Sequence, residues 1–545
     1  MSFRPRLTVP WAWGTPDGAL SPEERELIGA FARHRLGVTD APRRAVPSFA
    51  LASPRLAAPA SLRDIVVDFD DDRLAHAWGK SFADLARARE GRADHAPDLV
   101  AYPRDERDIE QLLDWASGEG VAVIAYGGGS SVVGGVTPDV GDGYAGTVSV
   151  DLQRLDRVLE VDAVSRAARV QAGVLGPSLA DQLRSSDLAL RHFPQSYEFS
   201  TLGGWIATRS GGHYATGRTR IDDFVEAVRV VSPSGAWETL RVPSSGAGPD
   251  AVRWVLGSEG SLGIITQAWI RLEPRPRFKA SATVHFASLS SALHAVREIA
   301  QSGMWPASLR LLDRVEAMNS FVHDGSSEVL VLGFESAHHH PAPLLAAALE
   351  CCTDHGGVVA SRVSESVPAD RSADPARAHE RDDESQAWRA AFLRMPYIRD
   401  ALMDHAVICE TFETACTWDR AESVVESLRE SVRAALAEQS LDPSSVSFRF
   451  THAYPDGIAP YVTVLARGRH GRLDTQWQAV KDAAGEALVR AGATITHHHA
   501  VGRDHMTWYE VERPGPYGAA LAAAREALDP RGVMNPGVLL RSGSS

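Results

Sequence analysis

A glycine-rich turn directly after an apolar run constrains this chain most strongly. The segment reads VAVIAYGGGSSVVGG, from Val121 to Gly135. A short apolar run bounded by glycines is typical of a buried strand, and glycine lets the backbone approach a ligand closely. Successive amides in such a turn can surround an anion without a lysine. The stretch has neither GxGxxG nor GxxxxGK[ST] spacing, so on these residues alone a plain tight turn stays equally open.

Length and charge narrow the class of protein. At 545 residues the chain is too long for one ordinary core, so we expect two domains after an N-terminal segment. The net charge of −14 argues against nucleic-acid binding, which needs a basic face. No apolar run reaches about 18 residues, so we expect no membrane-spanning helix and only peripheral membrane contact.

The four cysteines suggest where the protein works. Cys351, Cys352, Cys409 and Cys416 lack CxxC spacing, which argues against a zinc or redox motif. So few cysteines in so long a chain fit unpaired thiols in a reducing compartment. Because the first residues also lack the apolar segment of a signal peptide, we expect a cytoplasmic protein.

The order of predicted elements indicates an α+β protein. Residues 21–37 read as a helix capped by Ser21, with Glu24 three residues later. Residues 97–129 read as strand, helix, strand and glycine turn, and short strands punctuated by glycine and proline follow. From residue 281 onward, strands alternate with amphipathic helices in a second α+β unit.

This pattern predicts a division of the chain. Residues 364–386 contain almost no large apolar side chains and are predicted to form a surface loop. The predicted divisions are an N-terminal helical segment over 1–95, a first domain over 96–275, a second domain over 276–500 and a C-terminal segment over 501–545 that returns to the first domain.

Three further glycine-dense segments belong with the first turn. They are PQSYEFSTLGGWIATRSGGHYATG (194–217), VLGSEGSLGIITQAWIRLEP (255–274) and VQAGVLGPSLADQL (170–183). In the second, GSEGSLG leads directly into a predicted strand, so several amides can point at one ligand. In this order, the segments resemble the FAD-binding domain of the vanillyl-alcohol-oxidase/p-cresol-methylhydroxylase (PCMH) family.

The resemblance implies a two-subdomain PCMH-type FAD-binding domain that carries an α+β cap domain for the substrate. It implies that the glycine turn cradles the FAD pyrophosphate. Gly129 stands where family members carry a flavin-linked histidine, and residues 194–217 contain no cysteine, so the implied FAD is non-covalent. The implied cofactor-binding residues are Ala125, Tyr126, Gly127, Gly128, Gly129, Ser130, Ser131, Pro194, Gln195, Ser196, Ser200, Thr201, Gly203, Gly204, Thr208, Arg209, Ser210, Glu259, Gly260, Leu262, Gly263, Ile264 and Ile265.

The second half carries a narrower resemblance. Its segments are PASLRLLD, YIRDALMDHAVICETFETACTWDR, HAYPDGIAPYVTVLA and THHHAVGRDHMTWY, and WAWG and DDRLAHAWGKS lie near the front. Together they resemble the alkyldihydroxyacetone-phosphate synthase branch of the family. The resemblance implies exchange of the acyl group of 1-acyl-dihydroxyacetone phosphate for a fatty alcohol, through an adduct at flavin N5 and without net redox. The expected partners are fatty acyl and alkyl lipid phosphates, and we expect a homodimer.

The same resemblance assigns roles to seven residues. Arg399 would bind the substrate phosphate, since arginine offers a fork of donors. Arg310 would bind substrate or flavin, and His192 would take a secondary place in substrate binding. Tyr461 would be the base near the flavin, provided that nearby cations lower its pKa from about 10. One histidine of the triplet His497, His498 and His499 would deprotonate the alcohol, and the sequence leaves open which one. If the triplet forms a strand, at most His497 and His499 share a face.

A flavin oxidoreductase is the alternative reading. Relatives that oxidise a 2-hydroxy acid such as D-lactate or glycolate share the FAD domain, and oxidation of a specialised metabolite also stays open. The relatives that oxidise a 2-hydroxy acid carry a glutamate–histidine pair that binds a metal, whereas this chain has HHHAVG at that place. His452 with His498 and His499 is the nearest equivalent, but we expect no metal.

Overall fold

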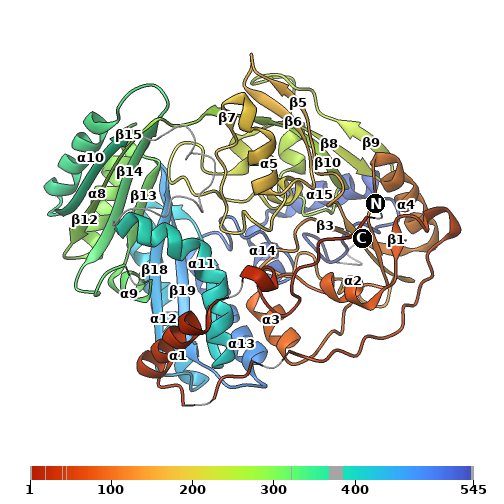
Figure 1. Ribbon diagram of the computed structural model, residues 1–545, viewed down its shortest axis with the longest axis horizontal. Helices are drawn as coiled ribbons and strands as arrows, with labels where there is room; N and C mark the ends of the chain where they lie inside the picture. The colour runs from red at the N-terminus through yellow and green to blue at the C-terminus, as the bar shows by residue number, and fades with distance from the viewer. Residues whose placement is uncertain are drawn as a thin grey trace.

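The computed structural model describes residues 3–18, 20–39, 41–44, 46–320, 322–366 and 384–541, and most of the predicted surface loop lies outside them. Figure 1 shows two α+β units side by side, so the predicted fold class is confirmed. The first unit, coloured orange to yellow-green, lies on the right, and the second, green to light blue, lies on the left. Within the described residues, no helix combines the length and apolar character needed to cross a membrane.

The predicted strand, helix and strand before the glycine turn are confirmed. They are β2 (Leu99–Ala101), α4 (Glu106–Glu119) and β3 (Val121–Tyr126). Asp105 caps α4 by accepting the Asp108 amide, and Gly120 ends it with a φ of 68°. In this sheet β4 (Gly146–Asp151) lies parallel between β2 and β3, and β1 (Val66–Val67) is antiparallel at the edge. The glycine turn therefore leaves the carboxyl end of β3.

Residues near the other end of the chain complete this sheet edge. The amide of Val123 donates to the carbonyl of Val533, and the amide of Asn535 donates to the carbonyl of Val123. Val533 and Met534 are fully buried in the core of the first unit. The described part of the 501–545 segment thus reaches β3.

An antiparallel sheet forms the other half of the first unit. Its strands run in the order β5 (Val158–Asp162), β6 (Ala167–Gln171), β10 (Ile264–Arg271), β8 (Val225–Ser232) and β9 (Gly235–Glu238). β10 begins directly after GSEGSLG, as predicted. The short helices α5 (Gly176–Gln182), α6 (Leu202–Thr208) and α7 (Ala251–Val255) connect or cover these strands.

An eight-stranded sheet is the centre of the second unit. It runs in the order β15 (Val358–Ser366), β12 (Phe278–Phe286), β14 (Glu328–Ser336), β13 (Ser308–Leu312), β18 (Ser444–Ala453), β19 (Gly457–Arg467) and β16 (Val407–Glu413), and β17 (Cys416–Thr417) also pairs with β19. Helices that pack on it are α8 (Leu289–Gln301), α9 (Arg314–Asn319), α10 (Ala342–Asp354) and α12 (Ala421–Glu438). A two-stranded ribbon of β7 (Leu188–Ala189) and β11 (Glu273–Pro274) lies at the passage from the first unit.

Segments from both ends of the chain join the units. α1 (Pro22–Leu36) packs on α11 (Glu384–Asp404), and the predicted Ser21–Glu24 capping box is confirmed. α3 (Phe82–Arg89) packs on α13 (Leu473–Ala491) of the second unit. α2 (Asp70–Ala75), α14 (Met506–Glu512) and α15 (Gly515–Leu528) complete the helices that bear on the site.

Two large cores match the two units. One gathers buried side chains between Leu62 and Leu272 together with Val533 and Met534. The other gathers side chains mainly between Ala280 and Ile495, with Phe82 and its neighbours from α3. The cores change over between Leu272 and Ala280, while the detailed domain limits stay predictions.

Candidate active site

A long cavity lies where the two units meet. The first unit contributes the glycine turn and the 194–212 segment, and the second contributes α11, β16, β18, β19 and the histidine triplet. A second cavity continues behind the turn, between β3 and the start of β10. The glycine-dense segments 121–135, 194–217 and 255–274 therefore line adjoining cavities, whereas no residue of the described 170–183 segment lines either of them.

The glycine turn lies flat against a neighbouring segment. A Cβ on Gly128 would overlap the carbonyl of Phe199, and one on Gly127 would overlap the side chain of Thr201. Gly129 has a φ of 66°, a conformation that glycine adopts without strain. Among the described residues, the amides of Gly128, Gly129 and Ser130 donate to no protein group, and the side-chain bonds of this turn involve only the amides of Val133 and Gly135. Amides that line a cavity without a partner fit the pyrophosphate of a dinucleotide.

Most of the predicted cofactor residues line these two cavities. Arg209 and Leu262 are the exceptions: Arg209 pairs with Asp222 at 2.7 Å, and Leu262 is buried against Val501 and Met506. Those that line a cavity are Ala125, Tyr126, Gly127, Gly128, Gly129, Ser130, Ser131, Pro194, Gln195, Ser196, Ser200, Thr201, Gly203, Gly204, Thr208, Ser210, Glu259, Gly260, Gly263, Ile264 and Ile265.

Glu259 connects the cofactor side to the segment after the histidines. Its two carboxylate oxygens accept the amides of Val501 and Gly502 at 2.9 and 2.8 Å. Burial raises the pKa of Glu259 to about 7, although these two bonds oppose the rise. Glu259 has a φ of 49°, so the backbone turns sharply to place this side chain.

Tyr461 lies between two charged side chains on one face of the cap sheet. On β19 it stands opposite Glu413 of β16 and opposite Arg449 of β18, and residues directly opposite share a face. The Arg449 guanidinium carbon lies 3.7 Å from the centre of the Tyr461 ring. Burial nevertheless raises the pKa of Tyr461, with Arg449 opposing it. The lowered pKa that a tyrosine base requires is therefore not found, and the phenol is neutral.

The histidine triplet forms a bend, so the expectation of a strand is wrong. The side chain of Glu413 causes the bend because its Oε1 accepts three successive amides. The distances are 3.0 Å to His497, 2.6 Å to His498 and 2.7 Å to His499. His498 and His499 line the cavity, whereas His497 is buried behind them. The face sharing expected for His497 and His499 thus gives way to the pair His498 and His499.

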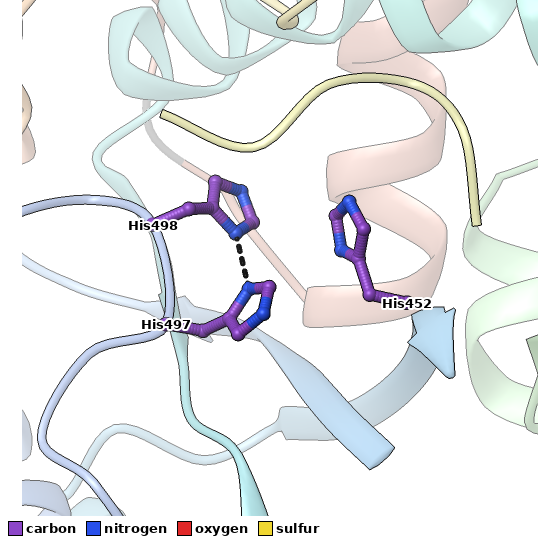
Figure 2. A group of neighbouring side chains, drawn as sticks. All are labelled: His452, His497 and His498. Atoms are coloured by element: carbon purple, nitrogen blue, oxygen red, sulfur yellow. Dashed lines mark hydrogen bonds between the residues drawn. The ribbon is translucent and has the colours of Figure 1, made fainter. Parts of the chain in front are cut away.

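A cluster of imidazoles surrounds this bend. Figure 2 shows His497 and His498 side by side, with their Nδ1 atoms 2.9 Å apart, and His452 facing them from the end of β18. The Nε2 of His497 lies 2.8 Å from the hydroxyl of Tyr454, and the Nε2 of His452 lies 3.0 Å from the carbonyl of Gly212. Burial lowers the pKa of His497 to about 4 and that of His499 to about 3, although Glu413 opposes both shifts.

The cluster also has the composition of a metal site. Ligand atoms of His452, His497 and His498 lie within 4.8 Å of one another, as do those of Glu413, His498 and His499. Their hydrogen bonds already engage both ring nitrogens of His452 and of His497. We therefore describe the cluster as a hydrogen-bonded network.

Two of the predicted substrate residues bring positive charge to the cavity. Arg399 of α11 donates to the carbonyl of Lys80 at 2.8 Å, and its second terminal nitrogen lies 3.5 Å from Asp400. Within the described part of the chain, that nitrogen and Nε are buried without a hydrogen bond. Arg310 of β13 is 2 % exposed and donates to the carbonyl of His213 at 2.7 Å. Both line the cavity, so an anion there can meet guanidinium donors.

His192 lies outside the cavity lining. Its Nε2 is 2.7 Å from the hydroxyl of Ser210, which itself lines the cavity. Burial lowers the pKa of His192 to about 3. The ring is therefore neutral, and it contacts Ser210 and not the cavity itself.

The far end of the cavity is apolar. Side chains of α1, α11 and the N-terminal segment line it, and the amide of Trp13 donates to Asp400 at 2.6 Å. Lys80 holds the same segment by donating to the carbonyl of Val9 at 2.6 Å, and burial lowers its pKa to about 8. The apolar lining residues are Trp13, Ile28, Phe31, Met395, Ile398, Leu402 and Leu465.

Sequence reasoning missed several residues of the site. Glu413 lies in the motif at 397–420, but the resemblance assigns it no role, and Arg449 and Glu316 lie outside the motifs that carry the resemblance. Glu316 of α9 is buried and pairs with Arg449 at 3.2 Å. The alternation of β16, β18 and β19 could have placed Glu413 and Arg449 beside Tyr461, but only once the strand register was known.

Comparisons with known proteins agree with this arrangement. The family model described as FAD binding domain matches residues 97–241. The one described as FAD linked oxidases, C-terminal domain, matches residues 275–539. The cradle and the cavity behind it lie largely in the first match, and Tyr461 and the histidine bend lie in the second. FAD is therefore the cofactor, and the residues present fit it.

Individual relatives share most of the chain. Alkyldihydroxyacetonephosphate synthase of Dictyostelium discoideum is 29% identical over 86% of this chain and 78% of its own. The enzyme of that name from Caenorhabditis elegans is 29% identical over 89% of this chain and 85% of its own. A solved alkyldihydroxyacetonephosphate synthase structure, 24% identical, superposes with a TM-score of 0.77 over 96% of this chain and 94% of that one, which shows a common fold. The chain belongs to the family of FAD-linked flavoproteins that includes the alkyldihydroxyacetonephosphate synthases.

Proposed function

We propose that this chain exchanges the acyl group of 1-acyl-dihydroxyacetone phosphate for a long-chain fatty alcohol. The products are alkyl-dihydroxyacetone phosphate and a fatty acid. One carbon–oxygen bond replaces another, so electrons balance without an external oxidant. The relatives named alkyldihydroxyacetonephosphate synthase support this reaction over oxidation of a 2-hydroxy acid.

One observation carries the proposal. A single cavity joins the glycine cradle, two arginines, a neutral tyrosine with histidines, and an apolar end. Such a cavity suits a ligand with a phosphate at one place, a reactive carbon near the flavin and a long alkyl chain. A small 2-hydroxy acid has no alkyl chain long enough to contact the apolar side chains of α1 and α11.

The charged and polar residues divide the work. Arg399 and Arg310 bind and orient the phosphate, because guanidinium groups match its oxygens. Bound FAD supplies an electron-poor ring at which the substrate carbon reacts. Tyr461 keeps its proton and donates a hydrogen bond to substrate oxygen, and a cavity-facing histidine accepts the proton of the alcohol.

The apolar end receives the alkyl chain. Ile28 and Phe31 of α1 and Leu402 of α11 line the cavity, and the two helices pack on each other, which fixes the relative positions of these side chains. Burying each methylene of the chain contributes about 0.8 kcal/mol to binding. Such substrates also support peripheral contact with a membrane, while the cytoplasmic location and the homodimer stay predictions.

The test compares two substrates under anaerobic conditions. Flavin-loaded protein is mixed with palmitoyl-dihydroxyacetone phosphate and hexadecanol, and separately with D-lactate. We expect palmitate release with alkyl product from the lipid, and no lasting bleaching of the flavin by lactate. Lasting reduction by lactate without palmitate release from the lipid would overturn the proposal.

A further inference from the structure

Glu413 holds the histidine bend from inside the protein. It ends β16 and is 2 % exposed. Beyond the three amides of the triplet, its Oε1 also accepts the hydroxyl of Thr496 at 3.0 Å. Four donors on one oxygen of a buried carboxylate is a dense arrangement, and it leaves the second oxygen for another partner.

That second oxygen faces imidazoles. Oε2 lies 2.5 Å from Nδ1 of His498 and 3.5 Å from Nδ1 of His497; within the described residues these are ion-pair contacts without the alignment of a hydrogen bond. The hydrogen bond of the His498 Nδ1 is with the Nδ1 of His497 at 2.9 Å, beside the carboxylate. Burial alone would raise the pKa of Glu413, but the histidines around it together hold that pKa well below its ordinary value. The carboxylate is therefore charged, and a charged acceptor stabilises an N–H on the ring nitrogen that faces it.

We propose that Glu413 is a positioning residue, which bends the triplet and, through its charge next to Nδ1 of His498, keeps the proton of that ring on Nδ1 and leaves Nε2 as the proton acceptor. The assignment of the proton to an alcohol substrate rests on the proposed function. The geometry of His498 does not rest on the proposed function. In this role Glu413 acts through His498 and contacts neither substrate nor flavin.

The three histidines are not equivalent for this role. His497 is buried, and its Nε2 is engaged by Tyr454. His499 lines the cavity, but its Nδ1 lies 3.9 Å from the carboxylate. His498 alone among the three combines cavity lining with a contact of 2.5 Å to Glu413. Gly211 packs on its ring, where a Cβ would lie 2.9 Å from the ring carbon Cγ.

Transfer of the alcohol proton to His498 accompanies the exchange of the groups on C1. The O–H bond of the alcohol breaks, its proton moves to Nε2 of His498, and the electron pair stays on the oxygen that bonds to C1. The acyl carboxylate leaves with the electron pair of the old C1–O bond, and the proton is released with the fatty acid. The imidazolium formed in between lies next to a carboxylate, which lowers its energy.

Other charged and titratable groups surround Glu413 and enter any pH profile. They come from β18 and the turn after it, from β19, and from the loop that follows α6. These groups are His452, Tyr454, Tyr461, His497, His499 and Arg220.

The decisive variant is Glu413→Gln. Its amide oxygen can still accept the three backbone amides, so the bend remains. Its NH₂ group, however, would face Nδ1 of His498 and favour the tautomer with the proton on Nε2. We expect kcat to fall by at least about 100-fold, the lower range of general-base catalysis, with KM and FAD content nearly unchanged.

The matched control is Glu410→Gln. Glu410 lies on the same strand, is also buried, and accepts hydrogen bonds from Trp477 at 2.6 Å and Lys481 at 3.2 Å, outside the cavity lining. It can lose stability like Glu413→Gln, but its kcat and the acid limb of its pH profile should match the wild type. Equal losses of kcat in both variants would mean that Glu413 is merely structural and would overturn the proposal.

A second readout does not depend on activity. Nitrogen-15 NMR of histidine-labelled wild-type protein, assigned with His498→Asn, should show His498 as the Nδ1–H tautomer. In Glu413→Gln this signal should change to the Nε2–H tautomer. An Nε2–H tautomer in the wild type would end the proposal. The wild-type signal serves even if the variant does not fold. If exchange activity is missing while the tautomers behave as expected, the proposed function fails and the positioning role stands.

Discussion

The two sides of the cavity are built from different materials. On the first unit, glycines let the backbone lie close to residues 199–201, and the turn presents amides that have no partner among the described protein groups. On the second unit, side chains from separate strands and loops meet: Tyr461, Arg449 and Glu413, with the histidine bend held by the last of them. The backbone side suits an anion of one shape, whereas the side-chain side can change its chemistry through single substitutions. A cofactor half of this kind can therefore be common to many enzymes, while the reaction is decided by the cap.

The largest expected effect comes from breaking the backbone side. In Gly128→Val, the new side chain would collide with the carbonyl of Phe199, so the turn must move. We expect loss of bound FAD and of all activity, measured by absorbance near 450 nm after desalting. Gly118→Ala, in α4 with open space around the added Cβ, should keep the flavin. Full flavin content in Gly128→Val would contradict the cradle.

Breaking the side-chain side should spare the flavin. Tyr461→Phe removes the hydroxyl but keeps the ring under Arg449. We expect exchange activity to fall by about 100-fold or more with normal FAD content. Tyr144→Phe, which loses a bond to the carbonyl of Gly532 away from the cavity, is the control. Unchanged exchange in Tyr461→Phe would remove the tyrosine from the mechanism.

Acid should weaken the side-chain side. His497 and His499 have folded pKa values of about 4 and 3, below the unfolded value near 6.5. Their contribution to stability is present above pH 6.5 and is lost as the pH falls toward 4. We expect each of these two histidines to lower the free energy of unfolding by about 2 kcal/mol between pH 7 and pH 5.

Urea unfolding at pH 7 and pH 5 measures this loss. His499→Gln should reduce the difference between the two pH values by its own share. His338→Asn, an exposed position after β14, should leave the difference as in the wild type. An equal pH difference in all three proteins would show that the buried imidazoles are not its source.

The smallest expected effect tests the phosphate contact. Arg399→Lys keeps the charge but loses the planar fork of donors. We expect KM for the lipid phosphate to rise by about 10-fold, or about 1.4 kcal/mol, with kcat less affected. Arg394→Lys, on the same helix but paired with Glu24 at the surface, should behave as the wild type. A larger effect of Arg394→Lys would place the phosphate elsewhere.

The difference between the two sides also decides what sequence could predict. The strand, helix and glycine turn over 97–129 are local, and so is the Ser21–Glu24 capping box; both could be predicted from spacing. The pairing of Glu413 with Tyr461 depends on strand register between segments far apart in the chain. The strand expected for the histidines failed because a side chain 84 residues away binds their amides. The pKa of Tyr461 also depends on burial, which no local pattern contains.

The hydrogen bonds between Val123 and residues 533 and 535 have a consequence for biosynthesis. The strand that leads into the glycine cradle acquires its last partner only from residues synthesised some 410 positions later. A growing chain on the ribosome can thus collapse its first core but cannot finish the edge beside the pyrophosphate. We therefore expect FAD to bind only after the chain is complete, and FAD added after translation should bind the apoprotein.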